Sequence, residues 1–525
     1  MVSIEDGMSA MGFRKIASIA KSANQNTGVY YVALESTYSP IRNILGLHGV
    51  RNEKDKKKER LREIAYPLAK ADIIGFSSMT NNADFTRAII KEIREINPKS
   101  YIVWGGIHPI VFPEDAIHSV NAICVGEGEY PFMEFISLFK SGKDYTGIKN
   151  FWFNLNGEIK RNGLLPLNKQ EDMNQFPFPL YAEDEFLFKR EKGFFPMTQL
   201  DFFKFNGLGY HTIWTIGCPY KCSYCSNTTF LKNDKSYGKL RYPSTEYIVN
   251  EVKNVLNKHS HVSTVVFYDD SFMSVPSSTL KKFSELWREK INLPFCVMGV
   301  IPSYVKKEKM KILIEAGMIR MRMGIQSASD RMLKFYHRPN KPGLINDVIS
   351  TIGSFSDYMI PPAYDFIVDN PIETRQDIID TLELVYSINT PFTINPHALN
   401  VYPNTVMEAQ FEELGLNPKD VTASNFSHFA PTFSNILLYA LTLFKPPRRL
   451  FDYMLKYVKP LLEKQTKFPK LLILFRMLYL SKRVYHHVRF MDFSIIPGRF
   501  WFLVWKLGLI EFWKKVIWKP KFRER

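Results

Sequence analysis

The chain has 525 residues, more than one hydrophobic core supports, so we expect two to four domains. Its 45% hydrophobic and 23% charged residues are typical of a folded globular protein. Residues 1–23 lack the apolar run of about 7 to 15 residues that a signal peptide needs, and the five cysteines are mostly clustered. These features exclude secretion and predict a cytoplasmic protein.

The net charge of +17 is unevenly distributed along the chain. Residues 445–525 hold 20 Lys and Arg against 5 Asp and Glu, whereas the preceding 444 residues hold 49 against 47. The basic character therefore belongs to the C-terminal tail, and any attraction of anions is expected there.

The first 145 residues have the pattern of a parallel α/β domain. Short apolar runs alternate with amphipathic helices such as 84–96. The predicted strands are Val29–Leu34, Asp72–Thr80, Tyr101–Trp104 and Ala122–Val125. The last three strands end in glycine-rich or hydroxyl-rich turns, and ligands bind beyond the carboxyl ends of parallel strands. A nucleotide-sized pocket is expected there, although the G-x-G-x-x-G and P-loop motifs are absent.

Residues 146–200 are predicted to connect two domains. Residues 151–158 predict a β-hairpin with Asn156-Gly157 at its turn, and 176–179 are extended and broken by proline.

Three cysteines then fall close together, at Cys218, Cys222 and Cys225, with the spacing C-x3-C-x2-C. Thiolates favour zinc, copper(I) or iron-sulfur clusters, and a structural zinc site would take a fourth Cys or His nearby. No such ligand is evident, since His211 has an unusual spacing and the next cysteine is Cys296. An iron-sulfur cubane held by three thiolates keeps one iron open for a substrate or cofactor. A zinc knot or three incidental buried thiols are the disfavoured alternatives.

Alternating strands and helices continue around and after the cysteines, within residues 201–425. The predicted strands are 212–216, 262–268, 295–300, 321–325, 363–368 and 391–400, with helices starting at Ser244, Ser277, Lys306 and Ser329. Six β/α units predict a partial (β/α)6 barrel with its active site at the carboxyl ends of the strands.

The cysteine motif, with Tyr224 before its last cysteine, resembles the signature of radical S-adenosylmethionine (SAM) enzymes. The resemblance implies a [4Fe-4S] cluster on Cys218, Cys222 and Cys225, with SAM on the open iron and cleaved reductively to a 5'-deoxyadenosyl radical. It places Tyr224 near the adenine, Asp269 or Asp270 at the SAM amino group, Gln326 at the ribose and residues 365–374 beside the adenine. One departure is Ile216, where relatives often carry Arg.

The segments GFSSMT, VWGGIHP and CVGEGE resemble the cobalamin-binding domain that precedes the barrel in one radical SAM class. By that resemblance the corrin and its nucleotide tail are lined by Ser77, Thr80, Gly105, Gly106, Gly126, Glu127 and Gly128. The D-x-H-x-x-G motif is absent, so we do not expect histidine ligation of cobalt. Alternatives remain at three places: Glu127 and Glu129 as helix caps, His108 as a loop histidine, and Glu373 as a cap, which we favour.

The tail, residues 426–525, matches no motif but interleaves aromatic and basic residues and holds four of the eight tryptophans. As one helix, residues 500–519 place Glu511, Lys514, Lys515 and Lys519 on one face and an apolar set on the other. That set is Phe502, Trp505, Leu509, Phe512, Trp513, Val516 and Ile517. This composition is typical of a helix lying in a membrane interface. A helical cap on the barrel is the second interpretation, and nucleic acid is the least favoured partner because no RNA-binding signature is present.

The fold class expected is α/β, with a Rossmann-like cobalamin domain, a connector, a radical SAM barrel and a helical tail. The function expected is C-methylation of an unactivated carbon of a small-molecule or lipid substrate. The alternatives are oxidation, cyclisation or rearrangement with the same cofactors, and a non-catalytic, membrane-tethered cobalamin or SAM sensor. A flavodoxin or ferredoxin is the expected electron donor, and the inner face of the membrane is the expected peripheral location.

Overall fold

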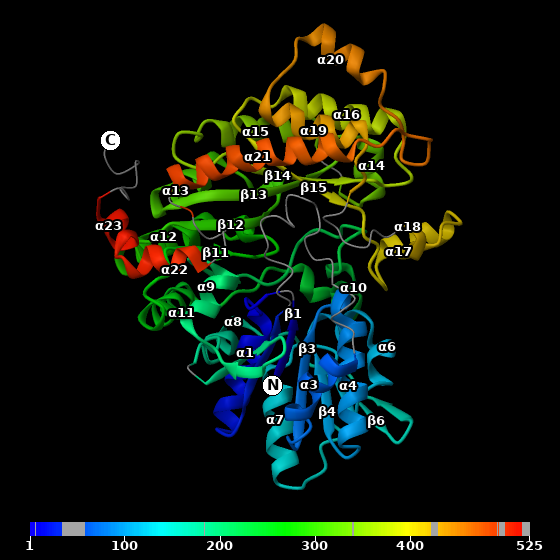
Figure 1. The fold of residues 1–525 in the computed structure, drawn as a ribbon, viewed down its shortest axis with the longest axis vertical. Coiled ribbons are helices and arrows are strands. Elements are labelled where there is room, and N and C mark those ends of the chain that lie inside the picture. The colour runs from blue at the N-terminus through cyan, green and yellow to red at the C-terminus, as the bar shows by residue number, and fades with distance from the viewer. Residues whose placement is uncertain are drawn as a thin grey trace.

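The computed structural model describes residues 1–5, 7–33, 58–182, 184–338, 341–421, 429–490, 492 and 499–516. The described chain forms two β-sheets with helices packed on them, and a set of C-terminal helices lies over the second sheet (Figure 1). In Figure 1 the N-terminal sheet is at the bottom in blue and cyan, and the second sheet is above it in green.

The N-terminal sheet has nine strands in the order β7-β6-β5-β4-β3-β1-β2-β8-β9. The strands are β1 (Val2–Glu5), β2 (Val29–Ala33), β3 (Ile73–Ser78), β4 (Tyr101–Gly105), β5 (Ala122–Cys124), β6 (Phe151–Leu155), β7 (Glu158–Arg161), β8 (Glu185–Lys189) and β9 (Gly193–Pro196). The six strands from β5 to β8 in this order run parallel, and β6, β7 and β9 are added antiparallel at the edges.

Helices cover both faces of this sheet. They are α1 (Met11–Ala23), α3 (Lys58–Leu68), α4 (Ala83–Ile96), α5 (Ile107–Val111), α6 (Pro113–Ile117), α7 (Glu129–Lys140) and α8 (Gln170–Met173). Apolar side chains of α3 and α4, such as Ile64 and Ile89, pack on one face, and those of α1 and α7, such as Ala20 and Phe135, pack on the other. A parallel sheet covered on both faces is the expected environment for strands with continuous apolar runs.

For this sheet the sequence analysis missed one strand and predicted the hairpin correctly. It missed β1, which has only four residues yet lies between β2 and β3 near the centre. The hairpin is β6 and β7, with Asn156 and Gly157 both at positive φ in its turn. The residues expected to connect the domains contribute β6 to β9 to the first sheet.

The second sheet is the partial barrel that the alternating pattern predicted. Its six strands are parallel and follow chain order: β10 (Gly209–Thr212), β11 (Thr264–Phe267), β12 (Phe295–Val300), β13 (Met318–Gln326), β14 (Ala363–Val368) and β15 (Thr393–Ala398). The first strand was placed three residues too late, since 213–216 follow β10 rather than belonging to it. β10 and β15 are the two edges.

The helices of this domain alternate with the strands. They are α9 (Gln199–Asn206), α10 (Asn227–Asn233), α11 (Thr245–Lys258), α12 (Ser277–Lys290), α13 (Lys307–Ala316), α14 (Asp330–Phe335), α15 (Leu344–Gly353), α16 (Arg375–Ser387), α17 (Val406–Glu413) and α18 (Pro418–Val421). Ser244 and Ser329 cap α11 and α14 as predicted, because each hydroxyl accepts a hydrogen bond from a backbone N–H of the first turn.

The described residues of the tail form five helices, α19 (Phe433–Leu443), α20 (Arg448–Leu455), α21 (Pro469–Arg489), α22 (Arg499–Lys506) and α23 (Leu509–Val516). The continuous helix predicted for 500–519 is wrong, because Gly508 has φ of 70° and separates α22 from α23. Phe502 and Trp505, predicted to face a membrane, instead contact Phe203 of α9. Residues 517–519, and the side chains of 513–516, lie outside the described part of the chain. Of the described helices, none has the length and apolarity to cross a bilayer.

Candidate active site

The loop that carries the three cysteines leaves the barrel through a tight turn. Gly217 has φ of 101°, and a Cβ there would lie 2.6 Å from the Lys239 carbonyl oxygen and 2.8 Å from that of Tyr237. Ile216 and Arg241 exchange two backbone hydrogen bonds, of 2.8 and 2.9 Å, directly before this turn. The backbone of residue 216 therefore anchors the loop, and this chain does so with Ile in place of the Arg of many relatives.

Side chains that follow β11 form hydrogen bonds with the same loop. The buried Asp269 carboxylate accepts hydrogen bonds from the backbone N–H groups of Thr215 and of Trp214, the latter at 3.3 Å. Ser271 donates to the Gly217 carbonyl oxygen at 3.0 Å. Burial raises the pKa of Asp269 to about 7, although these hydrogen bonds act in the opposite direction. Asp269 thus supports the cysteine loop, and its neighbour Asp270 is the exposed carboxylate of the pair.

The other side of the loop rests on the C-terminal end of α14. Ser223 donates its N–H to the Tyr336 carbonyl oxygen and its hydroxyl to that of Phe335, both at 3.0 Å. Tyr336 accepts a hydrogen bond of 2.9 Å on its phenol oxygen from Asn370, in the loop between β14 and α16.

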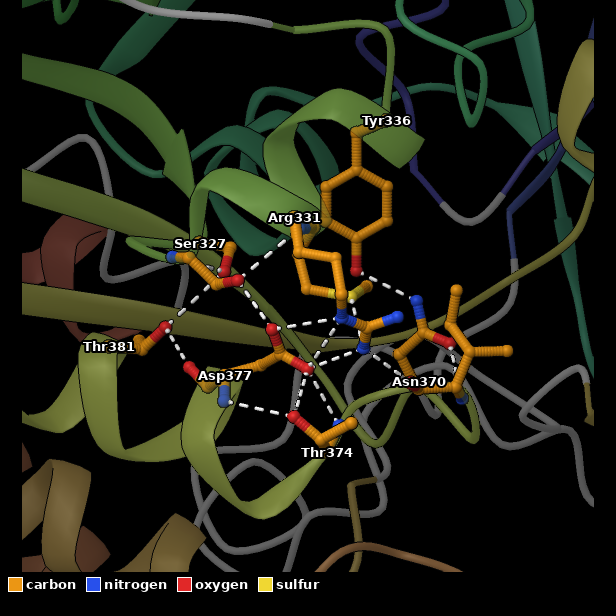
Figure 2. Close-up of polar contacts among 10 residues, drawn as sticks. Ser327, Arg331, Tyr336, Asn370, Thr374, Asp377 and Thr381 are labelled. Atoms are coloured by element: carbon orange, nitrogen blue, oxygen red, sulfur yellow. Dashed lines mark hydrogen bonds and ion pairs between the residues drawn. The ribbon is translucent and has the colours of Figure 1, made fainter. Parts of the chain in front are cut away.

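A polar network joins α14 to the start of α16, as Figure 2 shows. Its centre is Asp377, which pairs with Arg331 and accepts hydrogen bonds from Ser329 and Thr374. Thr381 continues the network to Ser327, directly after β13. These contacts lower the pKa of Asp377 well below its usual range, against the effect of burial. The network fixes the helix on which the cysteine loop rests.

This geometry corrects the interpretation of Glu373. Thr374 and Asp377 form the capping box of α16, so Glu373 does not cap that helix. Its carboxyl is buried, and burial, with the nearby charge of Asp377, raises its pKa to about 8. Glu373 lines a small pocket between α16 and the tail, together with Asp369, Asn435 and Gln465.

Arg338 is a buried cation beside the cysteines that the sequence analysis missed. Its NH1 lies 3.3 Å from Cys222 Sγ, its NH2 donates to the Gly324 carbonyl oxygen at 2.8 Å, and its guanidinium lies over the ring of Tyr220. No local pattern marks this residue, because it follows α14 by three positions and reaches the loop only through the fold. A positive charge here suits a negatively charged cluster and the carboxylate of SAM.

The donor set fits an iron-sulfur cluster. Burial and, to a smaller extent, the charge of Asp270 raise the pKa of Cys218 to about 11 and that of Cys225 to about 12. Within the described residues, no three His, Cys, Asp or Glu side chains are placed to hold one metal ion. A cubane is bound with one thiolate per iron, so its ligands do not have to converge on a single atom. Cys218, Cys222 and Cys225 are all free thiols and would be its ligands.

Two further predicted SAM residues lie next to the cysteine loop. Tyr224 is half-buried, with its ring edge-to-face on Tyr336 at 5.5 Å. Gln326 ends β13 at an unusual φ of 75°, and its amide folds over Gly324, where a Cβ would lie 2.5 Å from Nε2. Such strained backbone is typical of functional sites. The fold therefore brings Tyr224, Gln326 and Asp270 to the same end of the barrel as the cysteines.

The barrel interior below this end is polar. Arg322 of β13 donates from Nε to both oxygens of Asp365, at 2.6 and 2.7 Å, and Asn395 donates to the same carboxylate at 3.0 Å. Arg322 NH2 lies 2.6 Å from His397 Nε2, and because a guanidinium only donates, that nitrogen is the acceptor of a neutral imidazole. Burial and the charge of Arg322 lower the pKa of His397 to about 4.

The glycine-rich turns of the N-terminal domain meet at one edge of its sheet. Ser77 pairs with Gly105, and Gly106 follows at φ of 90°, where a Cβ would lie 2.9 Å from Ser77 Oγ and from Ser78 N. A Cβ at Gly105 would meet Phe76 O at 3.8 Å and Cys124 Cβ at 4.0 Å, which are ordinary van der Waals distances. Thr80 begins a 3₁₀ turn after β3, on the same edge.

The turn after β5 completes this edge. A Cβ at Gly126 would lie 2.8 Å from the Asn150 side chain, and one at Gly128 would touch Ile16 and Cys124. These close approaches show that two of the glycines serve backbone packing. Gly105 has the most distant neighbours of these glycines, at 3.8 and 4.0 Å, so packing within the protein does not require a glycine there.

The N-cap residue of α7 is Gly128, which has no side chain, so neither Glu127 nor Glu129 is the N-cap of this helix. Glu127 instead forms an ion pair with Arg241 at 2.7 Å and accepts a hydrogen bond of 2.6 Å from the Asn168 backbone. Glu129 accepts a hydrogen bond of 3.2 Å from the Asn168 side chain. Glu127 thus links the turn after β5 to Arg241, which lies between the cysteine loop and α11.

His108 is not in a loop but in α5, and it is buried against Trp104. Its Nε2 lies 2.9 Å from Asp115, its Nδ1 has no partner, and burial lowers its pKa. A packed, paired imidazole of this kind is a structural residue.

The carboxyl ends of the two sheets face each other across the middle of the molecule. Arg241 reaches Glu127, Asn404 beyond β15 donates to the Val111 carbonyl oxygen at 2.7 Å, and Ser9 beyond β1 lies 2.6 Å from His211 of β10. In Figure 1, α10, which follows the cysteines, lies between the two domains. A ligand on one strand edge therefore faces a ligand on the other.

Comparison with known proteins decides the family. Residues 212–385 match the family model of the Radical SAM superfamily, and residues 46–136 match that of the B12 binding domain. The chain therefore carries a radical SAM domain and a B12-binding domain, the two domains of cobalamin-binding radical SAM proteins. The matched domains are those that use SAM with an iron-sulfur cluster and cobalamin, and the two matched segments fall within the two facing domains.

Three known proteins illustrate the likeness of this cobalamin-binding radical SAM protein. An uncharacterised methyltransferase of Pyrococcus horikoshii is 24% identical over 326 residues, 61% of this chain and 65% of that protein, and so less than two thirds of its length. The anaerobic magnesium-protoporphyrin IX monomethyl ester cyclase of Rubrivivax gelatinosus is 24% identical over 371 residues, 69% of this chain and 61% of the cyclase. The radical SAM methyltransferase TsrM of Kitasatospora setae, solved with cobalamin and a [4Fe-4S] cluster bound, superposes with a TM-score of 0.58 at 16% identity. That superposition covers 79% of this chain and 74% of TsrM.

Proposed function

We propose that this protein is a cobalamin-dependent radical SAM methyltransferase that adds a methyl group to an unactivated carbon of a hydrophobic, lipid-like substrate. The observation that carries the proposal is the opposition of the two strand edges, joined by Arg241 and Glu127. When bound, the cofactors supply a 5'-deoxyadenosyl radical from one edge and a methyl group from the other. A substrate carbon held between the edges is accessible to both.

The chain's own residues position the reactants and exclude water. Cys218, Cys222 and Cys225 would hold the cluster, and Arg338 offers a positive charge to Cys222 and to the SAM carboxylate. Asp270 and Gln326 would contact the amino group and the ribose of SAM. Ser77, Thr80, Gly105 and the turn at 126–128 would line the corrin.

Two features support the class of substrate. The wall formed by Arg322, Asp365 and His397 offers a charged pair and a neutral imidazole inside the barrel, which suits a polar group at the reacting end. The tail exposes apolar side chains such as Phe500 and Leu503, which suits an apolar remainder. A substrate with one polar end and a hydrophobic body fits both.

The second candidate keeps the cofactors but uses the substrate radical for oxidation, cyclisation or rearrangement. The similarity to a cyclase favours it. A third, non-catalytic candidate is a cobalamin or SAM sensor. Either enzyme would take its electron from a flavodoxin or ferredoxin, and a cytoplasmic enzyme at the inner face of a membrane is the location that we propose.

The test is methyl transfer by the full-length protein with its cluster and cobalamin restored. Given a low-potential electron donor, methyl-labelled SAM and a membrane lipid extract, it should form 5'-deoxyadenosine and label one lipid or hydrophobic metabolite. Cys222→Ala is the control that should abolish both. Formation of 5'-deoxyadenosine with no label transferred to any extract would support the second candidate. If protein loaded with cluster and cobalamin formed no 5'-deoxyadenosine, both enzymatic hypotheses would be refuted and the non-catalytic sensor would be the remaining candidate.

A further inference from the structure

The outer face of α21 is apolar and has no partner among the described residues. Leu471, Leu474, Leu478, Tyr485 and Val488 recur at spacings that place them on one side of the helix, and each is 39% to 63% exposed. Met477 and Val484 widen this stripe. A helix of 21 residues is about 32 Å long, so the stripe extends over much of one side of the barrel domain.

The opposite face of α21 already fixes the helix to the protein. Leu472 and Tyr479 are buried, and the Tyr479 phenol accepts a hydrogen bond from the Ile394 N–H at 3.1 Å and donates to the Ile394 carbonyl oxygen. His487 is buried against Asp492. The outer stripe is therefore additional to the packing that folds this helix, and an exposed apolar surface of this kind is typical of a contact with protein or membrane.

Charge identifies the occupant of the stripe. α21 contains five Lys and Arg residues and no Asp or Glu. Lys467 and Lys470 are exposed at its start and Arg489 at its end, so cations bracket the apolar stripe. A second copy of the helix would bring these like charges together, whereas an anionic lipid surface would neutralise them.

We propose that the outer face of α21 is the surface that docks this protein on an anionic membrane. The docking surface was expected in residues 500–519, but α22 uses Phe502 and Trp505 to pack on α9. α21 packs on α19 and reaches β15, an edge strand of the barrel, through the hydrogen bonds of Tyr479 to Ile394. Docking through α21 therefore brings the barrel edge at β15, which Tyr479 contacts, close to lipid. This deepens the proposed function, and rests on it for the substrate, which it identifies as a molecule dissolved in the bilayer.

The test is flotation of the full-length protein with lipid vesicles. Vesicles of phosphatidylcholine with about one third phosphatidylglycerol should carry the protein upward, vesicles of phosphatidylcholine alone should carry much less, and added salt should weaken binding. The double variant Leu474→Glu, Leu478→Glu, at 50% and 49% exposure, should lower the partition coefficient by about tenfold or more.

The matched control is Leu155→Glu, Leu164→Glu, at 42% and 37% exposure on the N-terminal domain, which should bind vesicles as the unmodified chain does. Circular dichroism should show that both variants remain folded. Equal loss of binding in both double variants would overturn the assignment to α21. The assignment would also be overturned if the unmodified protein did not bind anionic vesicles. A dimer of the unmodified protein that is lost only in the α21 variant would overturn it as well.

Vesicle binding and catalysis are separate readouts. The α21 variant should form 5'-deoxyadenosine in solution at the rate of the unmodified protein, because its substitutions are remote from the cysteine loop. Vesicle binding without any 5'-deoxyadenosine would refute the proposed function and still support the docking surface. Formation of 5'-deoxyadenosine without vesicle binding would refute the docking surface and still support the proposed function.

Discussion

Replacing Gly217 by Ala should disrupt the cysteine loop more than an equivalent change elsewhere. At φ of 101°, any residue with a Cβ is strained, which costs about 1 to 2 kcal/mol. At this site the Cβ would also lie 2.6 and 2.8 Å from two backbone oxygens, those of Lys239 and Tyr237. Backbone atoms cannot swing aside as a flexible side chain can.

The second contribution to the destabilisation arises because the Cβ would force the segment at Gly217 away from the segment that contains Tyr237 and Lys239. Separating the two segments breaks the pair of hydrogen bonds between Ile216 and Arg241, of 2.8 and 2.9 Å. At about 0.5 to 1.5 kcal/mol each, their loss adds about 1 to 3 kcal/mol to the strain. Gly217→Ala should therefore destabilise the loop by about 2 to 5 kcal/mol in all.

Gly157 supplies a matched control. Its φ is 102°, and a Cβ there would meet nothing within 4 Å, so Gly157→Ala bears the strain but not the collision. After anaerobic reconstitution, iron and sulfide per chain should fall sharply in Gly217→Ala and stay near the unmodified level in Gly157→Ala. Equal cluster content in the two variants would refute this account of the turn.

Three further predictions concern charged groups. Arg338→Met should make the reduction potential of the cluster more negative by about 60 to 130 mV, the equivalent of one charge-assisted hydrogen bond. Arg338→Lys, which keeps the charge, should recover part of this shift. An unchanged potential in a redox titration followed by electron paramagnetic resonance would contradict the prediction. Arg241→Met breaks the ion pair with Glu127 and should lower methyl transfer about tenfold more than 5'-deoxyadenosine formation, so an equal fall in both rates would argue against a role in aligning the domains. Burial raises the pKa of Glu373 to about 8. Between about pH 4.5 and 8, the native protein therefore binds one proton more than the unfolded protein. Because of this difference, the free energy of unfolding falls as the pH rises through this window. Glu373→Gln should remove that loss, on the order of 3 kcal/mol near pH 7, and a melting temperature with the same pH dependence in both proteins would exclude the effect.

The elements with strong periodicity were predictable from the sequence. Ser277–Lys290 is a helix with the bounds predicted, and the strands at 295–300 and 363–368 also match. Their apolar residues recur at the period of one kind of element, and a capping or breaking residue marks each end. β1 was missed because four residues show too few periods, and its central place depends on pairing with β2 and β3.

The sequence by itself determined the kind of chemistry, because C-x3-C-x2-C places three soft ligands on one short loop wherever that loop folds. It also indicated that polar turns follow the parallel strands. Only the tertiary structure decided which polar groups meet. Arg338 lies 116 residues from Cys222, and Glu127 lies 114 from Arg241, so no local pattern relates them. The two faces of the tail helices were decided in the same way: a helical wheel shows that α22 has an apolar side, and only contact with α9 shows that this side is already covered.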